Sequence, residues 1–167
     1  MEFIKKININ RIIVEIVFIV IAISFLSCNQ KDIKKETAEQ FIRSYYKQYE
    51  YQDEIKEIFE VMDVEKLEEE VEKYIGKYFE NSLTEKAIDI CLRNRIIPLS
   101  SILNKEIYDF KLEKLTITQR KQESEQNTYD FEVKVNYKEK NQRIEKIEKG
   151  TIVLEKEGEK IDYFSIK

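Results

Sequence analysis

The chain has 167 residues, of which 42% are hydrophobic, 11% aromatic and 37% charged, which is enough apolar material for one domain with a core. Its 29 basic and 33 acidic side chains give a formal net charge of −4, so nothing in the charge favours nucleic-acid binding. The three glycines form no phosphate-binding motif, and the absence of histidine excludes Ser-His-Asp and Cys-His catalysis and the commonest zinc ligand.

The N-terminal segment has the pattern of a secretory signal peptide. Lys5, Lys6 and Arg11 precede an apolar run over residues 12–26 that carries one charge, Glu15. A basic region followed by a short apolar run is typical of export signals. As a helix this run would span about 22 Å, short of the hydrocarbon core of about 30 Å. We therefore expect export, with an uncleaved membrane span as the weaker alternative.

The apolar run ends in Phe25-Leu26-Ser27-Cys28, which resembles the lipobox of bacterial lipoproteins, although leucine is usual where Phe25 stands. In that family the cysteine thiol receives a diacylglycerol and the signal is cut just before it. The resemblance implies a signal peptide over residues 1–27, lipid attachment at Cys28 and a polar tether over residues 28–36. Two acyl chains anchor a protein stably. We expect the mature protein at the extracytoplasmic face of the cell membrane.

The first periodic segment follows this tether. Thr37 and Gln40 have the spacing of a capping box, and apolar residues then recur every three or four positions. The pattern predicts an amphipathic helix with a tyrosine-rich stripe that includes Tyr45, Tyr46 and Tyr49.

A second helix is predicted after Asp63, a candidate N-cap. Its apolar stripe spans about two heptads, too few to argue for a coiled coil, so we expect it to face the core. Most of its glutamates lie off the stripe and indicate a solvated face rather than a cation site. The stripe comprises Val64, Leu67, Val71, Tyr74 and Tyr78, and the glutamates are Glu68, Glu69, Glu70 and Glu72.

A third helix is predicted from a capping box at Ser82 and Glu85 toward Arg95, before Pro98. Cys91 lies on its apolar side, so we expect a small buried hydrophobe rather than a reactive thiol. With Cys28 lipidated, Cys91 has no partner for an intramolecular disulfide.

Beyond residue 107 the hydrophobic period changes from 3.6 to 2. The clearest strand has five alternating residues that we expect in the core: Tyr129, Phe131, Val133, Val135 and Tyr137. A further strand is predicted over residues 151–155, followed by a tight hairpin turn at Glu157-Gly158.

Helices followed by antiparallel strands indicate an α+β fold. Over residues 37–167 this order resembles the NTF2-like superfamily, in which a bent antiparallel sheet wraps a long first helix into a cone. A cystatin-like helix-plus-sheet domain is the nearest alternative. The NTF2-like resemblance rests on element order and aromatic stripes and includes no signature motif.

The function expected from these residues is binding, without catalysis, cofactor or metal. No acidic residue lies clearly on an apolar stripe; Asp89 comes closest, and we expect it on a solvated helix surface. Tyr45, Tyr49, Tyr129 and Tyr137 either line a pocket for a small ligand or protein partner or simply fill the core. The alternative function is a structural component of a cell-envelope or conjugative-transfer assembly, and a small enzyme is a third. The oligomeric state stays open.

Overall fold

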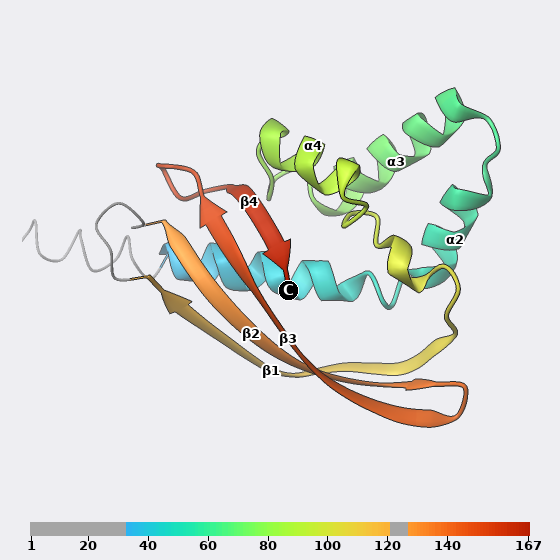
Figure 1. Cartoon of the computed structure of the whole chain (residues 1–167). Coiled ribbons are helices and arrows are strands. Elements are labelled where there is room, and N and C mark those ends of the chain that lie inside the picture. The colour runs from blue at the N-terminus through green and yellow to red at the C-terminus, as the bar shows by residue number, and fades with distance from the viewer. Residues whose placement is uncertain (1–32, 121–126) are drawn as a thin grey trace, which may run out of the picture. The chain divides into compact units, whose positions relative to one another are not determined.

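Figure 1 presents the computed structural model of the chain, which describes residues 33–120 and 127–167. The signal peptide and Cys28 lie outside the described residues. Residues 34–167 form one compact unit. In the part described, helices come first and a four-stranded antiparallel sheet follows, so the α+β prediction is confirmed.

The N-terminal helix is described over residues 33–47. Residues 33–36, expected in the tether, are already helical, and Thr37 lies inside the helix instead of capping it. Isoleucine, lysine and glutamate in this segment are compatible with helix. The Nζ of Lys34 also donates a hydrogen bond to Oδ1 of Asn127 at 2.9 Å, which fixes the early turn against the sheet end of the domain.

Three α-helices follow: α2 (Gln52–Glu60), α3 (Val64–Tyr78) and α4 (Glu85–Arg93). The predicted cap of α3 is confirmed, because the Asp63 carboxylate accepts a hydrogen bond from the backbone N–H of Lys66 at 3.0 Å.

The predicted cap of α4 is wrong by two residues. Thr84, not Ser82, accepts the hydrogen bond from the backbone N–H of Ala87. Ser82 is engaged elsewhere, since its carbonyl accepts a hydrogen bond from the N–H of Ile161 at 2.8 Å. Leu83 forms an isolated parallel bridge with the same Ile161. This tertiary pairing keeps the chain extended up to Thr84.

The sheet is a meander of four strands in chain order: β1 (Ile107–Gln119), β2 (Thr128–Glu139), β3 (Gln142–Leu154) and β4 (Ile161–Ile166). Lys140 and Asn141 join β2 to β3 with φ of 48° and 67°, the left-handed pair that a tight hairpin requires. The strand predicted over residues 151–155 is therefore only the end of a much longer β3.

The connection from β3 to β4 is longer than the predicted tight turn. It covers residues 155–160, within which the N–H of Gly158 donates to the carbonyl of Glu155 at 3.1 Å. Gly158 has φ of +83°, and a Cβ there would lie 2.5 Å from Cγ of Lys34. Both the backbone conformation and the lysine stem favour glycine at this position.

The core lies around the N-terminal helix, which crosses the strands in Figure 1. Phe41 contacts Phe164 of β4 edge-on at 5.0 Å between ring centroids and Phe79, after α3, at 6.2 Å. The five inward residues predicted for β2 are confirmed, because none is more than 7% exposed. Cys91 is also confirmed as a buried hydrophobe at 1% exposure, and burial raises the pKa of its thiol to about 11.

Candidate functional site

A cluster of aromatic rings forms where the C-terminal part of the first helix meets β1 and β2. Tyr49 stacks on Phe110 of β1, with 4.3 Å between centroids and 2° between planes. Phe110 also stacks with Tyr46 at 6.2 Å and with Tyr137 of β2 at 6.4 Å. Tyr45 packs edge-on against Tyr46 at 5.1 Å. These rings form one continuous contact network between the helix and the sheet.

A buried carboxylate lies beside this network. Glu148 of β3 faces the helix and is only 8% exposed. Its Oε2 accepts a hydrogen bond from the Tyr46 hydroxyl at 2.5 Å, and its Oε1 accepts one from Nζ of Lys146 at 2.5 Å. Glu148 and Lys146 lie opposite Val133 and Val135 of β2, on the inner face of the sheet. Each carboxylate oxygen thus has a donor, as a buried acid requires.

The surroundings keep the phenols of this cluster protonated. Burial is the main cause that raises the pKa of Tyr46 far above 10.0, and its hydrogen bond to Glu148 adds to the effect. Burial, together with the negative charge of Glu148, likewise raises the pKa of Tyr49. Burial in a low-dielectric site disfavours the phenolate. The hydroxyls therefore act as hydrogen-bond donors at neutral pH.

A groove of about 420 Å³ opens beside the cluster, between the first helix and β1. Tyr46, Phe110 and Leu112 give it an apolar wall, and charged side chains form the rest: Arg43, Lys47, Glu50, Lys111 and Glu113. The volume is at the small end of the range for ligand pockets, about 300–1,000 Å³.

The charges of the groove are not equally available to a ligand. Arg43 pairs with Glu39 at 2.7 Å. Glu113 accepts a hydrogen bond from Asn136 at 2.9 Å and forms an ion pair with Lys134 at 3.2 Å. The hydrogen bond from Asn136 is the main cause that lowers the pKa of the Glu113 carboxyl, and Lys134 adds to the effect. Lys47 and Lys111 have no ion pair within the described ranges. The groove therefore presents two ammonium groups without an ion pair among the described residues, next to aromatic rings.

The four tyrosines predicted to line a pocket occupy different environments. Tyr45, Tyr129 and Tyr137 are core residues at 3%, 1% and 7% exposure, and Tyr49 is half-buried. Tyr46 lines the groove directly. Tyr137 reaches it by stacking on Phe110, and Tyr49 by stacking on both Phe110 and Tyr46. The hydroxyl of Tyr129 is buried without a hydrogen-bond partner among the described residues.

Asp89, the acid closest to an apolar stripe in the sequence, lies on the exposed surface of α4. It forms an ion pair with Arg93 one turn away, at 2.7 Å, with 54% of its side chain exposed. The expectation of a solvated helix surface is confirmed, and Asp89 takes no part in the aromatic cluster.

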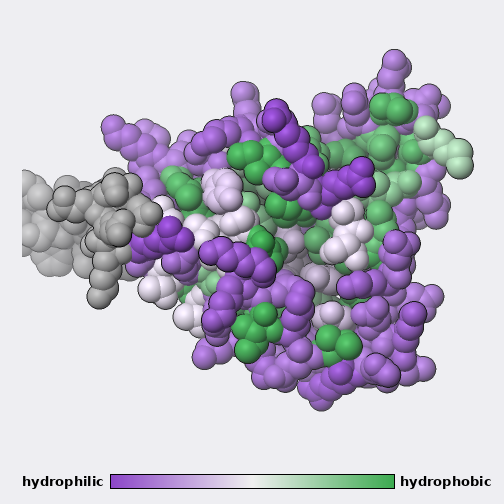
Figure 2. Space-filling model, in the orientation of Figure 1, coloured by the Kyte–Doolittle hydropathy of each residue, from purple (hydrophilic) through white to green (hydrophobic). Residues whose placement is uncertain are grey.

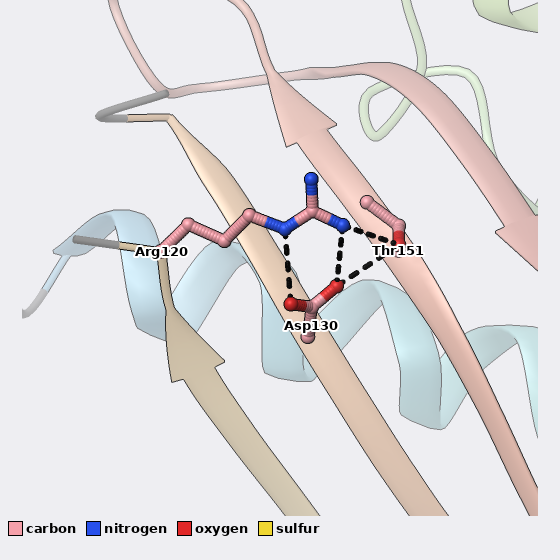
Figure 3. Close-up of polar contacts among 3 residues, drawn as sticks. All are labelled: Arg120, Asp130 and Thr151. Atoms are coloured by element: carbon pink, nitrogen blue, oxygen red, sulfur yellow. Dashed lines mark hydrogen bonds and ion pairs between the residues drawn. The ribbon is translucent and has the colours of Figure 1, made fainter. Parts of the chain in front are cut away.

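A second polar cluster, shown in Figure 3, joins the outer sides of three strands. Arg120 donates to both carboxylate oxygens of Asp130, at 2.9 and 2.8 Å, and Thr151 donates to Asp130 at 3.0 Å. The Arg120 hydrogen bond is the main cause that lowers the pKa of Asp130. Arg120 directly follows β1, Asp130 lies in β2 and Thr151 in β3, so these hydrogen bonds connect three neighbouring segments of the sheet. We interpret the cluster as stabilising the sheet.

Residues 33–120 and 127–167 contain neither a membrane-spanning helix nor a metal-binding cluster. No helix in these ranges combines the length and the apolar character needed to cross a bilayer. Nor do they bring together three or more acidic or cysteine side chains in a geometry suited to a metal ion.

Comparison of the chain with protein-family models, with curated proteins and with solved structures gives no match.

Proposed function

We propose that this protein is a lipid-anchored, extracytoplasmic binding module of NTF2-like architecture that holds a small, flat organic anion without transforming it. The groove between the first helix and β1 is the proposed site. The observation that carries the proposal is the pairing of the Phe110 ring system with two lysines, Lys47 and Lys111, that have no ion pair within the described ranges.

The chemistry of the groove favours this class of ligand. Rings stacked on Phe110 are rigid, so a flat apolar group can pack there with little loss of side-chain entropy. The ammonium groups of Lys47 and Lys111 would each donate to an anionic group at the groove mouth. Glu50, which also lines the groove, disfavours a ligand with negative charge distributed over its whole surface. A ring with one acidic substituent satisfies all three features.

The arrangement of Glu148 supports binding over catalysis. Both of its carboxylate oxygens already accept hydrogen bonds, from Tyr46 and Lys146. A general acid or base must instead reach a proton of the substrate. Glu148 fixes the orientation of Tyr46, which lines the groove, and so contributes to the site by positioning a ring.

The groove can be tested with anilinonaphthalene sulfonate, a fluorescent aromatic anion, added to a folded fragment that starts at residue 33. We expect saturable fluorescence, and Lys47→Gln or Lys111→Gln should weaken binding by about fivefold each, the equivalent of about 1 kcal/mol. Lys114→Gln, on the same strand but outside the groove, is the matched control. Equal effects of all three substitutions, or no saturable signal, would refute the site.

The anchor is a separate part of the proposal and rests on the sequence pattern that ends in Ser27-Cys28. Mass spectrometry of protein extracted from membranes of the native host should find residue 28 as the first residue, carrying lipid. Cys28→Ala should leave the precursor uncleaved in the membrane. An unmodified thiol at Cys28 with residues 1–27 still attached contradicts the anchor but leaves the groove proposal intact.

A role in assembly is the second candidate function. The element order described for residues 33–120 and 127–167 is equally compatible with NTF2-like domains that mediate contacts in larger complexes. A surface formed by α2 and α3 favours this candidate, because it leaves apolar side chains in solvent. A stable dimer of the mature domain in solution would support assembly over ligand binding.

A further inference from the structure

The helical hairpin of α2 and α3 carries an apolar stripe that is buried at one end and exposed at the other. Along α3, Tyr74 is 1% exposed, Val71 and Leu67 are half-buried, and Val64 is 69% exposed. Met62, in the link before α3, is 99% exposed. The sequence predicted a wholly core-facing stripe. That prediction is wrong at the start of α3, where Val64 is exposed and does not pack against the core of the described residues, whereas Leu67 and Val71 are partly buried against it. We call Met62, Val64, Leu67 and Val71 the hairpin stripe.

A groove of about 520 Å³ runs between α2 and α3. Its apolar part consists of Ile58, Val61 and Tyr74, and its charged rim of Glu54, Glu57, Glu70, Lys73 and Lys77. The Tyr74 hydroxyl is buried and has no hydrogen-bond partner among the described residues. In Figure 2, green apolar side chains interrupt the purple charged surface at the right-hand side, over the α2–α3 end of the domain.

The same hairpin is strongly acidic. Residues 52–78 contain ten acidic and four basic side chains, a formal charge of −6, whereas the whole chain has −4. Two of the lysines are already engaged, Lys73 with Glu70 at 2.6 Å and Lys77 with Glu54 at 3.0 Å. Glu57 and Glu60 have no ion pair among the described residues. Excess negative charge therefore surrounds an apolar stripe.

We propose that the hairpin stripe and the groove beside it dock a basic amphipathic helix of a partner protein. Apolar residues at helical spacing fit the helix-in-groove mode, in which the apolar face of a peptide helix lies along such a stripe. The acidic rim would pair with lysines or arginines that flank that face and would steer the partner toward it.

Charge decides between this occupant and two others. A second copy of the chain would present the same −6 hairpin, and like charges facing each other oppose association. A membrane with anionic lipids would repel the glutamates for the same reason. A basic helix is the occupant that buries the stripe and compensates the acids together. This inference is independent of the groove beside Phe110 and does not rest on the proposed ligand.

The test uses the full chain in phosphatidylcholine nanodiscs and a fluorescein-labelled peptide of leucine and lysine about four helical turns long, with leucines at helical spacing. Fluorescence polarisation should show saturable binding that weakens as salt is added. Val64→Ser should weaken binding by about tenfold or more, and Glu57→Gln by about threefold with a shallower salt dependence. Ile147→Ser, at a position 56% exposed on the sheet, is the matched control and should change nothing.

Three results would overturn the proposal. The first is equal binding to empty nanodiscs, which would assign the signal to lipid. The second is unchanged affinity in Val64→Ser, or the same loss in Ile147→Ser. The third is a dimer of the full chain in detergent that Val64→Ser disperses, since a second copy would then occupy the stripe. Val64, Glu57 and Ile147 are all exposed, so the three substitutions leave the core untouched.

Discussion

Raising the pH should unfold this protein through its buried tyrosines. Burial is the first cause that raises the pKa of Tyr45, Tyr46, Tyr49 and Tyr74 above the ordinary 10.0. In the unfolded chain these phenols ionise near pH 10, while in the folded chain they keep their protons. The folded state therefore binds more protons above pH 10, and its stability, fully present below that pH, falls as the pH rises further.

The size of the effect follows from the number of rings. Each tyrosine that is ionised only in the unfolded state lowers the free energy of unfolding by about 1.4 kcal/mol per pH unit. Four such rings lower it by roughly 5–6 kcal/mol per pH unit. Because small domains have about 5–15 kcal/mol of stability, we expect cooperative unfolding within about one to three pH units above 10. The thiol of Cys91, with its pKa of about 11 against an ordinary 9.0, begins to lower stability earlier.

The assay follows tyrosinate absorbance and far-ultraviolet circular dichroism during the same titration of the full chain. Part of the absorbance change should appear only together with the loss of helix and sheet signal. Tyr49→Phe should reduce the steepness of the unfolding transition by about a quarter. In denaturant, all ten tyrosines should titrate in one phase. One phase without denaturant, with the circular dichroism unchanged, would refute the reasoning, because it would mean that the rings are accessible in the folded protein.

Three further experiments, each based on substitutions, test the fold. Val133→Asp should lower the free energy of unfolding by several kcal/mol, because Val133 is 0% exposed. Lys134→Gln loses two partly exposed ion pairs on the opposite face of β2 and should cost about 1 kcal/mol or less. Equal melting temperatures of the two variants would show that the assigned faces of β2 are wrong. Gly150→Ala should cost about 1–3 kcal/mol, since its Cβ would clash with the Ser165 carbonyl and the Phe131 ring, and an unchanged midpoint in urea would contradict that packing. Asp63→Ala should cost about 1 kcal/mol through loss of the α3 cap, measured the same way, and Asp63→Asn should restore most of it.

Local sequence patterns predicted the structure correctly where a single short-range interaction determines it. Asp63 caps α3 as predicted, because the cap needs only a carboxylate and a free N–H three residues later. β2 was predicted with its inner and outer faces because its alternation is unbroken. Ser82 failed as a cap because Ile161, distant in sequence, pairs with its carbonyl and keeps this backbone extended. Thr37 failed because the helix already includes residues 33–36.

The buried acid of the site was missed because β3 does not alternate between apolar and polar residues. Its inner face includes Lys146, Glu148 and Gly150, where a half-buried strand normally has apolar side chains. The exposed Ile147 lies between them on the outer face, so the hydropathy pattern is inverted in this part of the strand. The Glu148 carboxylate is satisfied by one local donor, Lys146, and by one distant donor, Tyr46, from 102 positions earlier in the chain. The distant donor is the part that no neighbouring residue indicates. No local pattern contains that information.

The position of the groove depends on two β-bulges in β1, and both can be recognised in the spacing of its apolar residues. Asp109 and Phe110 together oppose Tyr137, with φ of 52° at Asp109, and Glu113 and Lys114 together oppose Lys134. One extra residue would turn every later side chain to the other face of the sheet, and a second restores the original facing, so Ile117 still faces Phe131.

Each bulge changes the spacing between apolar residues in the sequence. Apolar residues in β1 are three apart between Ile107 and Phe110 and again between Leu112 and Leu115, instead of two. The first bulge supplies Phe110 to the groove, and the segment between the two bulges supplies Lys111 and Leu112. Bulges bend a strand and redirect its side chains, which brings the Phe110 ring and Lys111 to the same side of the first helix. A strand with strict alternation would close over the helix as β2 does, and the groove would be filled by the core.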